Sequence, residues 1–188
     1  MMIEPGYLKN HFLIAMPALA QPDFFHTVTY ICEHNSDGAM GIVINRPLTL
    51  SLGEILNNLE LDAITPQIAL QPVYLGGPVR RERVFVIHEM SWQGELTLPV
   101  TETLGVTTSR DILAAMAHGE YTGQTLVALG YAGWTEGQLE QEIAANAWLS
   151  QEADQRILFD TPDDQRWQEA AMLLGIDINR LSGEFGHA

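Results

Sequence analysis

The most reactive side chains of the sequence lie close together near its start. Cys32 and His34 are two residues apart in a β-branched and aromatic run that predicts a strand. Residues two apart on a strand project to the same face, so the thiol and the imidazole could act as a nucleophile and its base. The sequence places no third group to orient the imidazole. We therefore favour the alternative, in which Cys32 is a small buried hydrophobe and His34 ends the strand.

Histidines are the other candidates for direct chemistry. No two of them have the H-x-H or H-x-x-x-H spacing that brings two imidazoles to one face of a strand or helix. The adjacent pairs Glu33-His34 and His88-Glu89 would point to opposite faces of a strand. We therefore expect no metal site and no other cofactor. The six histidines are His11, His26, His34, His88, His118 and His187.

A glycine-rich and aromatic tract from Gly130 to Glu140 is the most unusual segment. We interpret it as a strand-to-helix turn whose glycines let the backbone approach a ligand, with free N–H groups at the start of the helix. Tyr131 and Trp134 could stack against that ligand. The alternative is a tight turn with both aromatic rings in the core, and the sequence leaves the two open.

The basic residues form one cluster, Arg80, Arg81 and Arg83, just after the turn Gly76-Gly77-Pro78. We favour a solvated loop here. The alternative is a small clamp for an anion, completed by Arg46. No phosphate-binding loop, dinucleotide fingerprint or serine nucleophile elbow accompanies the cluster.

Apolar patterning predicts the elements that position these residues. Several predicted strands are joined by hairpin-length loops, which favours an α+β fold with a mixed sheet and flanking helices. A loop is expected at 61–72, an edge strand at 96–100, and a frayed tail from Asp177. The predicted strands are 12–16, 28–33, 40–45, 73–75, 84–88, 96–100, 126–129 and 157–159. The predicted helices begin near Ser51, Ser109, Thr135 and Thr161, the first and third with capping boxes to Glu54 and Gln138.

Composition limits the class of protein. With 188 residues and 46% apolar residues, the chain is expected to form a single domain, 1–188. Nine Lys and Arg against 24 Asp and Glu give a net charge of −15, which repels phosphate backbones and disfavours direct nucleic-acid binding. A single cysteine excludes an intrachain disulfide.

The first twenty residues decide the expected location. The apolar run 12–20 contains Pro17 and is far shorter than the roughly 20 residues of a membrane-spanning helix. Lys9 before it and Ala18-Leu19-Ala20 imitate a signal peptide, but Glu4 and the helix-breaking Pro17 argue against one. We expect a cytoplasmic protein with no membrane contact.

Seven sequence runs occur in a recognisable order: FLIAMP at 12–17, TVTY at 27–30, GAMGIVINRP at 38–47, GGPV at 76–79, LGYAGW at 129–134, GQLE at 137–140 and NAWL at 146–149. Together they resemble the YqgE/AlgH family over almost the whole chain. The resemblance implies a bacterial cytoplasmic protein whose mixed β-sheet curls into a partial barrel. It implies little about activity, because the family is largely uncharacterised, and the AlgH name is tied to a proposed role in regulating alginate production.

Our first hypothesis is a non-enzymatic binding module for an unidentified small molecule or protein partner. It requires three strand-end turns to lie at the same end of the sheet, where polar anchors, backbone donors and aromatic rings could converge. The residues proposed for this surface are Asn45, Arg46, Gly76, Gly77, Tyr131, Trp134 and Gln138.

Two alternatives remain. One is an enzyme that uses His34 as acid or base and Arg46 to hold an anion. The other is a transcriptional regulator, as the AlgH name suggests. Because no predicted helix bears several basic residues, we expect any effect on transcription to be indirect. The sequence leaves the oligomeric state open.

Overall fold

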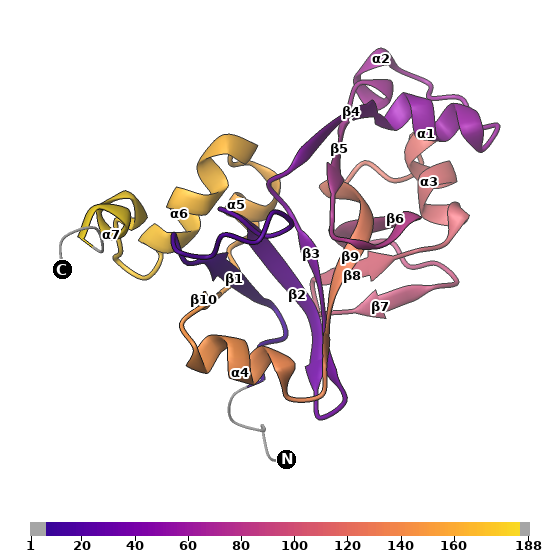
Figure 1. Ribbon diagram of the computed structural model, residues 1–188. Helices are drawn as coiled ribbons and strands as arrows, with labels where there is room; N and C mark the ends of the chain where they lie inside the picture. The colour runs from indigo at the N-terminus through magenta and orange to yellow at the C-terminus, as the bar shows by residue number, and fades with distance from the viewer. Residues whose placement is uncertain (1–6, 185–188) are drawn as a thin grey trace.

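Ten strands form one sheet in the computed structural model, which describes residues 7–184 and side chains as far as residue 181. The main path of the sheet is β10-β1-β2-β3-β9-β6-β8-β7, and β4 joins it through β5, which pairs with β9. The β5–β9 pair is parallel and the other pairs are antiparallel, so the sheet is mixed. It curls into a half-barrel (Figure 1), which confirms the expected α+β class.

The bounds of the elements are as follows. The strands are β1 (His11–Ala15), β2 (Val28–Asn35), β3 (Gly38–Val43), β4 (Pro47–Ser51), β5 (Pro72–Leu75), β6 (Val79–Glu89), β7 (Thr97–Pro99), β8 (Leu104–Thr107), β9 (Thr125–Thr135) and β10 (Trp148–Glu152). The helices are α1 (Leu52–Asn58), α2 (Pro66–Ala69), α3 (Arg110–Ala117), α4 (Gln138–Ala144), α5 (Gln155–Phe159), the 3-10 turn η1 (Asp163–Gln165), α6 (Arg166–Met172) and α7 (Ile178–Glu184).

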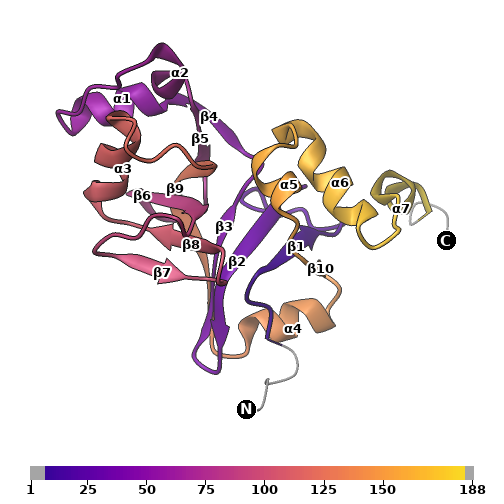
Figure 2. The same ribbon diagram turned by 180° about the vertical axis from the view of Figure 1, so that it is seen from behind.

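Two groups of helices cover different parts of the sheet. α1, α2 and α3 gather beside β5, β6 and β9, whereas α5, α6 and α7 lie on the side of β1 and β2, as Figures 1 and 2 show from opposite directions. α4 packs against β3, β9 and β10. Each group buries its own apolar cluster, and the cluster under α5 and α6 is built on Phe12, Tyr30 and Ile42. The helices therefore leave β9 between two separately packed regions.

β9 joins these two regions. One edge of β9 pairs with β5 through residues 127–129 and with β3 through residues 132–135. The other edge pairs with β6. The chain must therefore cross β9 between Leu75, at the end of β5, and Val79, at the start of β6.

Glycines make that crossing sterically possible. A Cβ atom on Gly77 would lie 2.1 Å from the carbonyl carbon of Tyr131, and one on Gly76 would lie 2.3 Å from the carbonyl oxygen of Gly130. Gly130 has φ +76°, and a Cβ atom there would lie 2.6 Å from the carbonyl oxygen of Gly77. Backbone crosses backbone here with no room for side chains, so Gly76, Gly77 and Gly130 are required by the fold.

Several predicted elements are confirmed. Strands occupy the core of the runs predicted at 12–16, 28–33, 40–45, 73–75, 84–88 and 126–129, and helices lie in all four predicted helical segments. Glu54 accepts a hydrogen bond from the backbone N–H of Ser51 at 2.8 Å, as the capping box at α1 predicts. Within residues 7–184, β7 pairs with β8 alone, which confirms an edge strand.

Other predictions are wrong. The run 157–159 belongs to helix α5, because the side chain of Asp154 caps it by accepting the N–H of Arg156 at 2.8 Å, and three apolar residues cannot distinguish strand from helix. The tract 130–135 continues strand β9 rather than turning. The predicted loop 61–72 holds α2, and the tail forms α7 because Ile178 is buried in the core. Strands β4, β8 and β10 were not predicted.

No helix within residues 7–184 is long and apolar enough to cross a membrane. Glu4, which enters the signal-peptide argument, lies outside the described residues, so the cytoplasmic location stays a prediction.

Candidate functional site

Cys32 and His34 do not share a face of β2. The pairing with β3 shifts between Ile31 and Glu33, because Ile31 pairs with Gly41 whereas Glu33 pairs with Met40. This β-bulge adds one residue and so reverses the alternation of the side chains beyond it. Cys32 lies in the cluster under α5 and α6, where burial raises the pKa of its thiol well above the usual range. The nucleophile–base pair is therefore wrong, and Cys32 is a buried hydrophobe.

His34 packs on the opposite face, beneath α4. Its side chain is 1% exposed, and its Nε2 is hydrogen-bonded to the carboxylate of Glu140. Its Nδ1 accepts the backbone N–H of Leu8 at 3.0 Å, so in the neutral ring the proton is on Nε2 and is donated to Glu140. Both ring nitrogens are thus engaged within the protein.

The enzyme hypothesis needs His34 and Arg46 at one substrate. His34 pairs with Ala39 at the hairpin end of β3, and Arg46 follows the other end of that strand. At about 3.3 Å per residue along β3, the backbone positions that carry the His34 and Arg46 side chains are roughly 20 Å apart. The structure does not bring them together.

Asn45 and Arg46 anchor the chain just before β2. The amide oxygen of Asn45 accepts the N–H of Val28 at 2.9 Å, and its amide nitrogen donates to the carbonyl of His26 at 2.9 Å. The guanidinium of Arg46 donates to the carbonyl of Phe25 at 3.0 Å. These contacts hold a loop to the sheet, so Asn45 and Arg46 each have a part in the fold.

Trp134 and Gln138 meet at Glu142, on the face of β9 covered by α4. The indole of Trp134 is 6% exposed and donates to Glu142 at 3.2 Å, as the indole of Trp148 does at 3.1 Å. Gln138 donates to the same carboxylate at 2.9 Å and accepts the N–H of Thr135 at 3.0 Å. Trp134 is a core residue in this arrangement, and its ring is not displayed for stacking.

The three predicted turns do not converge at one end of the sheet. Gly76 lies between Val43 and Leu129, accepting from the first at 2.8 Å and donating to the second at 2.7 Å. The Asn45 turn is adjacent, because Leu75 donates to the carbonyl of Arg46 at 2.8 Å. Trp134 and Gln138, however, lie at the hairpin end of β3. Two predicted site residues, Tyr131 and Trp134, are among those that line an open groove.

That groove is a hollow of about 600 Å³ across β3, β9 and β6. Tyr131 lies in its floor with its ring edge-on to Phe85, the two centroids 5.6 Å apart, and Met40 contributes from β3. Arg80 and Arg83 stand on the β6 side of the groove. The floor is thus aromatic and apolar, and one wall carries fixed positive charge.

The arginines reach this position because β6 leaves the sheet for four residues. Val79 pairs with Tyr131 and Val84 with Leu129, so residues 80–83 bulge outward opposite Gly130. Arg80 has φ +47°, an unusual value for a residue with a side chain. Arg81 pairs with Asp23 at 3.6 Å, whereas Arg80 and Arg83 form no ion pair with any described residue.

Within the described part of the chain, no three His, Cys, Asp or Glu side chains are grouped so that they could hold a metal ion. His187, one of the six histidines considered above, lies outside that part.

Sequence reasoning identified the arginine cluster but favoured a plain loop, and it missed Met40 and Phe85. The sequence did contain an indication of the arginine wall, because three arginines closely follow a glycine turn in a strongly acidic chain. It also missed Arg166, which is 4% exposed. Arg166 lies four residues before the buried Ala170, so a basic residue on the apolar stripe of the helix could have indicated it.

Comparisons with known proteins agree with the resemblance seen in the sequence. The model of the AlgH-like family matches residues 12–179. The chain is 56% identical over 182 residues to the UPF0301 protein of Nitrosococcus oceani, covering 97% of each. It is 48% identical to the solution structure of the AlgH protein from Pseudomonas aeruginosa, with a TM-score of 0.80 and complete coverage of both chains. A crystal structure of a protein from Corynebacterium diphtheriae, 18% identical with a TM-score of 0.70 over 93% of this chain and 91% of that one, shares the fold.

Proposed function

Because the chain belongs to the AlgH-like family and carries an open groove that joins aromatic and arginine side chains, we propose that it is a non-enzymatic binding module for an acidic segment of a protein partner. The observation that carries the proposal is that Arg80 and Arg83 are exposed and have no ion-pair partner among residues 7–181, in a chain with 24 acidic residues.

The composition of the groove supports a protein partner. Tyr, Phe, Met and Arg are the residue types enriched in protein interfaces, and here Tyr131, Phe85, Met40 and the two arginines share one surface. An apolar side chain of the partner would cover the Tyr131–Phe85 pair. A carboxylate beside it would pair with Arg83, whose guanidinium donates one long hydrogen bond, to Thr108 at 3.5 Å.

The charge of the whole chain shapes how such a partner binds. At −15 the protein repels an acidic partner at long range, so close contacts at the groove must supply the affinity. Moderate salt screens the repulsion over about 10 Å and leaves the contacts in place. Binding should therefore tolerate an increase in salt better than a simple charge attraction would.

Site-specific photo-crosslinking tests the proposal. We would place a photoreactive residue at Thr135, at the edge of the groove, and a matched one at exposed Thr49 in β4, both in living cells of the source bacterium. The expected result is a crosslink to an acidic, apolar segment of another protein at Thr135 only. Arg83→Glu should remove it.

Arg180→Glu makes the same charge change far from the groove and should leave the crosslink intact. A Thr135 crosslink that survives Arg83→Glu contradicts the arginine contact. A crosslink to a second copy of this chain, or to a small molecule alone, contradicts the class of partner.

A further inference from the structure

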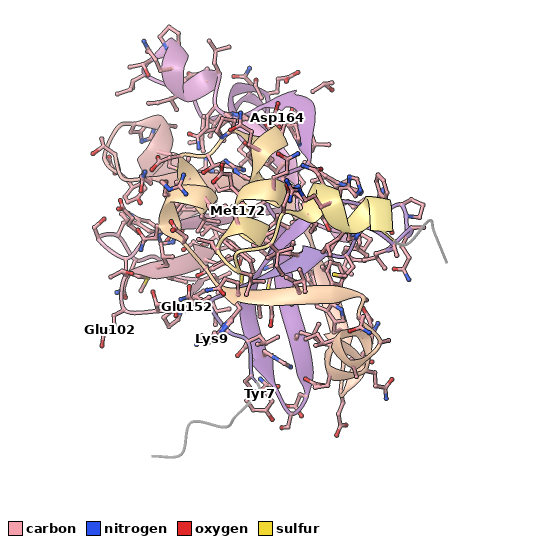
Figure 3. All side chains as sticks on the ribbon, turned by 90° about the vertical axis from the view of Figure 1, so that its left-hand side faces the viewer. Tyr7, Lys9, Glu102, Glu152, Asp164 and Met172 are labelled. Carbon is pink, nitrogen blue, oxygen red and sulfur yellow. The ribbon has the colours of Figure 1, made fainter. Side chains whose placement is uncertain are left out.

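A second arginine site lies where α5 packs over the start of β9 and the guanidinium of Arg166 lies over Tyr74 of β5. Arg166 opens α6, whose opposite end is marked by Met172 in Figure 3. Its Nε donates to the carbonyl of Thr161 at 2.9 Å, and its Nη1 donates to the carbonyl of Ile44. The guanidinium lies over the ring of Tyr74, 5.0 Å from its centroid. It therefore bridges the helical region to the end of β3.

No residue that the structure describes acts as a counter-ion to this buried cation. Arg166 is 4% exposed and forms no ion pair with any residue that the structure describes. A guanidinium has five N–H donors and holds its charge, yet the two carbonyls account for only two of them. Asp160, near in sequence, accepts the amide of Gln124 at 2.8 Å instead. Burying a charge without a partner is costly, so the arrangement favours an anion beside Arg166.

A cavity adjoins the guanidinium. It has a volume of about 310 Å³, and Arg166 is part of its lining. Leu126 and Phe159 are among its apolar walls, and Gln71 and Thr125, hydrogen-bonded to each other at 2.6 Å, supply a polar one. The volume is at the lower end of the range for small-molecule sites, so a ligand here is small.

We propose that this cavity, formed by β5, the start of β9, the end of α5 and Arg166 of α6, binds a small organic carboxylate whose charged end pairs with Arg166 and whose apolar body lies against Leu126 and Phe159. The planar fork of a guanidinium suits the two oxygens of a carboxylate. The apolar walls suit a hydrocarbon body, which inorganic phosphate lacks. The net charge of −15 also opposes ligands of higher negative charge.

The test is calorimetric titration of the full chain with benzoate, acetate and inorganic phosphate at constant ionic strength. The expected result is saturable binding of benzoate, at least tenfold tighter than that of acetate or phosphate. Gln71→Glu places a carboxylate on the wall of the same cavity, where its negative charge opposes that of a bound carboxylate, and should weaken benzoate binding at least tenfold.

Gln67→Glu is the matched control, because Gln67 lines the neighbouring hollow but not this cavity, and the added charge is the same. It should change the affinity less than twofold. Equal weakening by both variants would reveal a general charge effect and overturn the proposal. Absence of benzoate binding would also overturn it, as would phosphate binding tighter than that of benzoate. Neither variant removes the hydrogen bonds that Arg166 donates to Thr161 and Ile44.

Discussion

The two arginine sites are held in opposite ways. Arg80 and Arg83 are exposed and gain their position from the backbone, because the glycine crossing of β9 forces β6 to start beside Tyr131 and then bulge outward. Arg166 is buried and gains its position from its own hydrogen bonds to Thr161 and Ile44. The exposed arginines can therefore be substituted without loss of the fold, whereas the hydrogen bonds of the buried arginine help to hold the fold together.

The two kinds of arginine therefore differ in how much they contribute to binding and to the stability of the fold. A surface arginine contributes little to folding and remains available to a partner. A buried arginine that holds two carbonyls also stabilises the fold, so any ligand at its remaining donors is coupled to the stability of the whole chain. Substitutions at the glycine crossing, at Arg166, at His88 and at Arg83 test that contrast.

Gly77→Ala should have the largest effect. Its Cβ atom would lie 2.1 Å from backbone carbon and 2.2 Å from backbone oxygen of Tyr131, and neither can move without disrupting β9. We expect a loss of about 3 kcal/mol or more in the free energy of unfolding, measured by denaturant titration. Gly133→Ala is the control, since its Cβ atom would lie 3.4 Å from the nearest atom, in the ring of Tyr131. Similar losses in both would contradict the crossing as the cause.

Arg166→Met should follow. It keeps much of the side-chain volume but leaves the carbonyls of Ile44 and Thr161 without their donor, at a cost of about 2–4 kcal/mol in unfolding free energy. Arg180→Met replaces a side chain that is 86% exposed and should change the free energy of unfolding little. An Arg166→Met protein as stable as the parent would remove the distinction between the two sites.

His88 extends the comparison of exposed and buried basic side chains, because it is a buried imidazole whose neutral form is favoured by folding. Burial lowers the pKa of His88, against the opposing hydrogen bond to the carbonyl of Glu89. The unfolded chain therefore binds more protons than the folded one, and stability present above pH 6.5, the ordinary value, is lost as the pH falls below it. His88→Gln should flatten this decline in melting temperature. An unchanged slope would contradict the assignment.

Arg83→Ala should have the smallest effect on stability. Its one hydrogen bond, to Thr108, is 3.5 Å long, so the free energy of unfolding should change by less than about 0.5 kcal/mol in a denaturant titration. A loss comparable to that of Arg166→Met would mean that the bulge of β6 depends on its side chains.

Local patterns in the sequence were enough for much of the framework. The runs that form β1, β2 and β3 are rich in apolar and β-branched residues, which favours strands. Ser51 with Glu54 marks the start of α1. Short segments were ambiguous. Residues 157–159 have no strong intrinsic preference for strand over helix, and the N-cap at Asp154 starts a helix there. Glycine was misread in the tract after Leu129, because a glycine needed for close backbone contact looks the same in sequence as one in a turn.

The sequence by itself determined the α+β class, the family and the acidic charge, since these depend on composition and on neighbouring residues. Only the tertiary structure decided which residues meet. One bulge separates Cys32 from His34, and the crossing of β9 assigns Gly76 and Gly77 to the fold. Burial of Arg166 without a carboxylate depends on contacts with Ile44, 122 residues away in the chain, and no local pattern encodes a contact of that span.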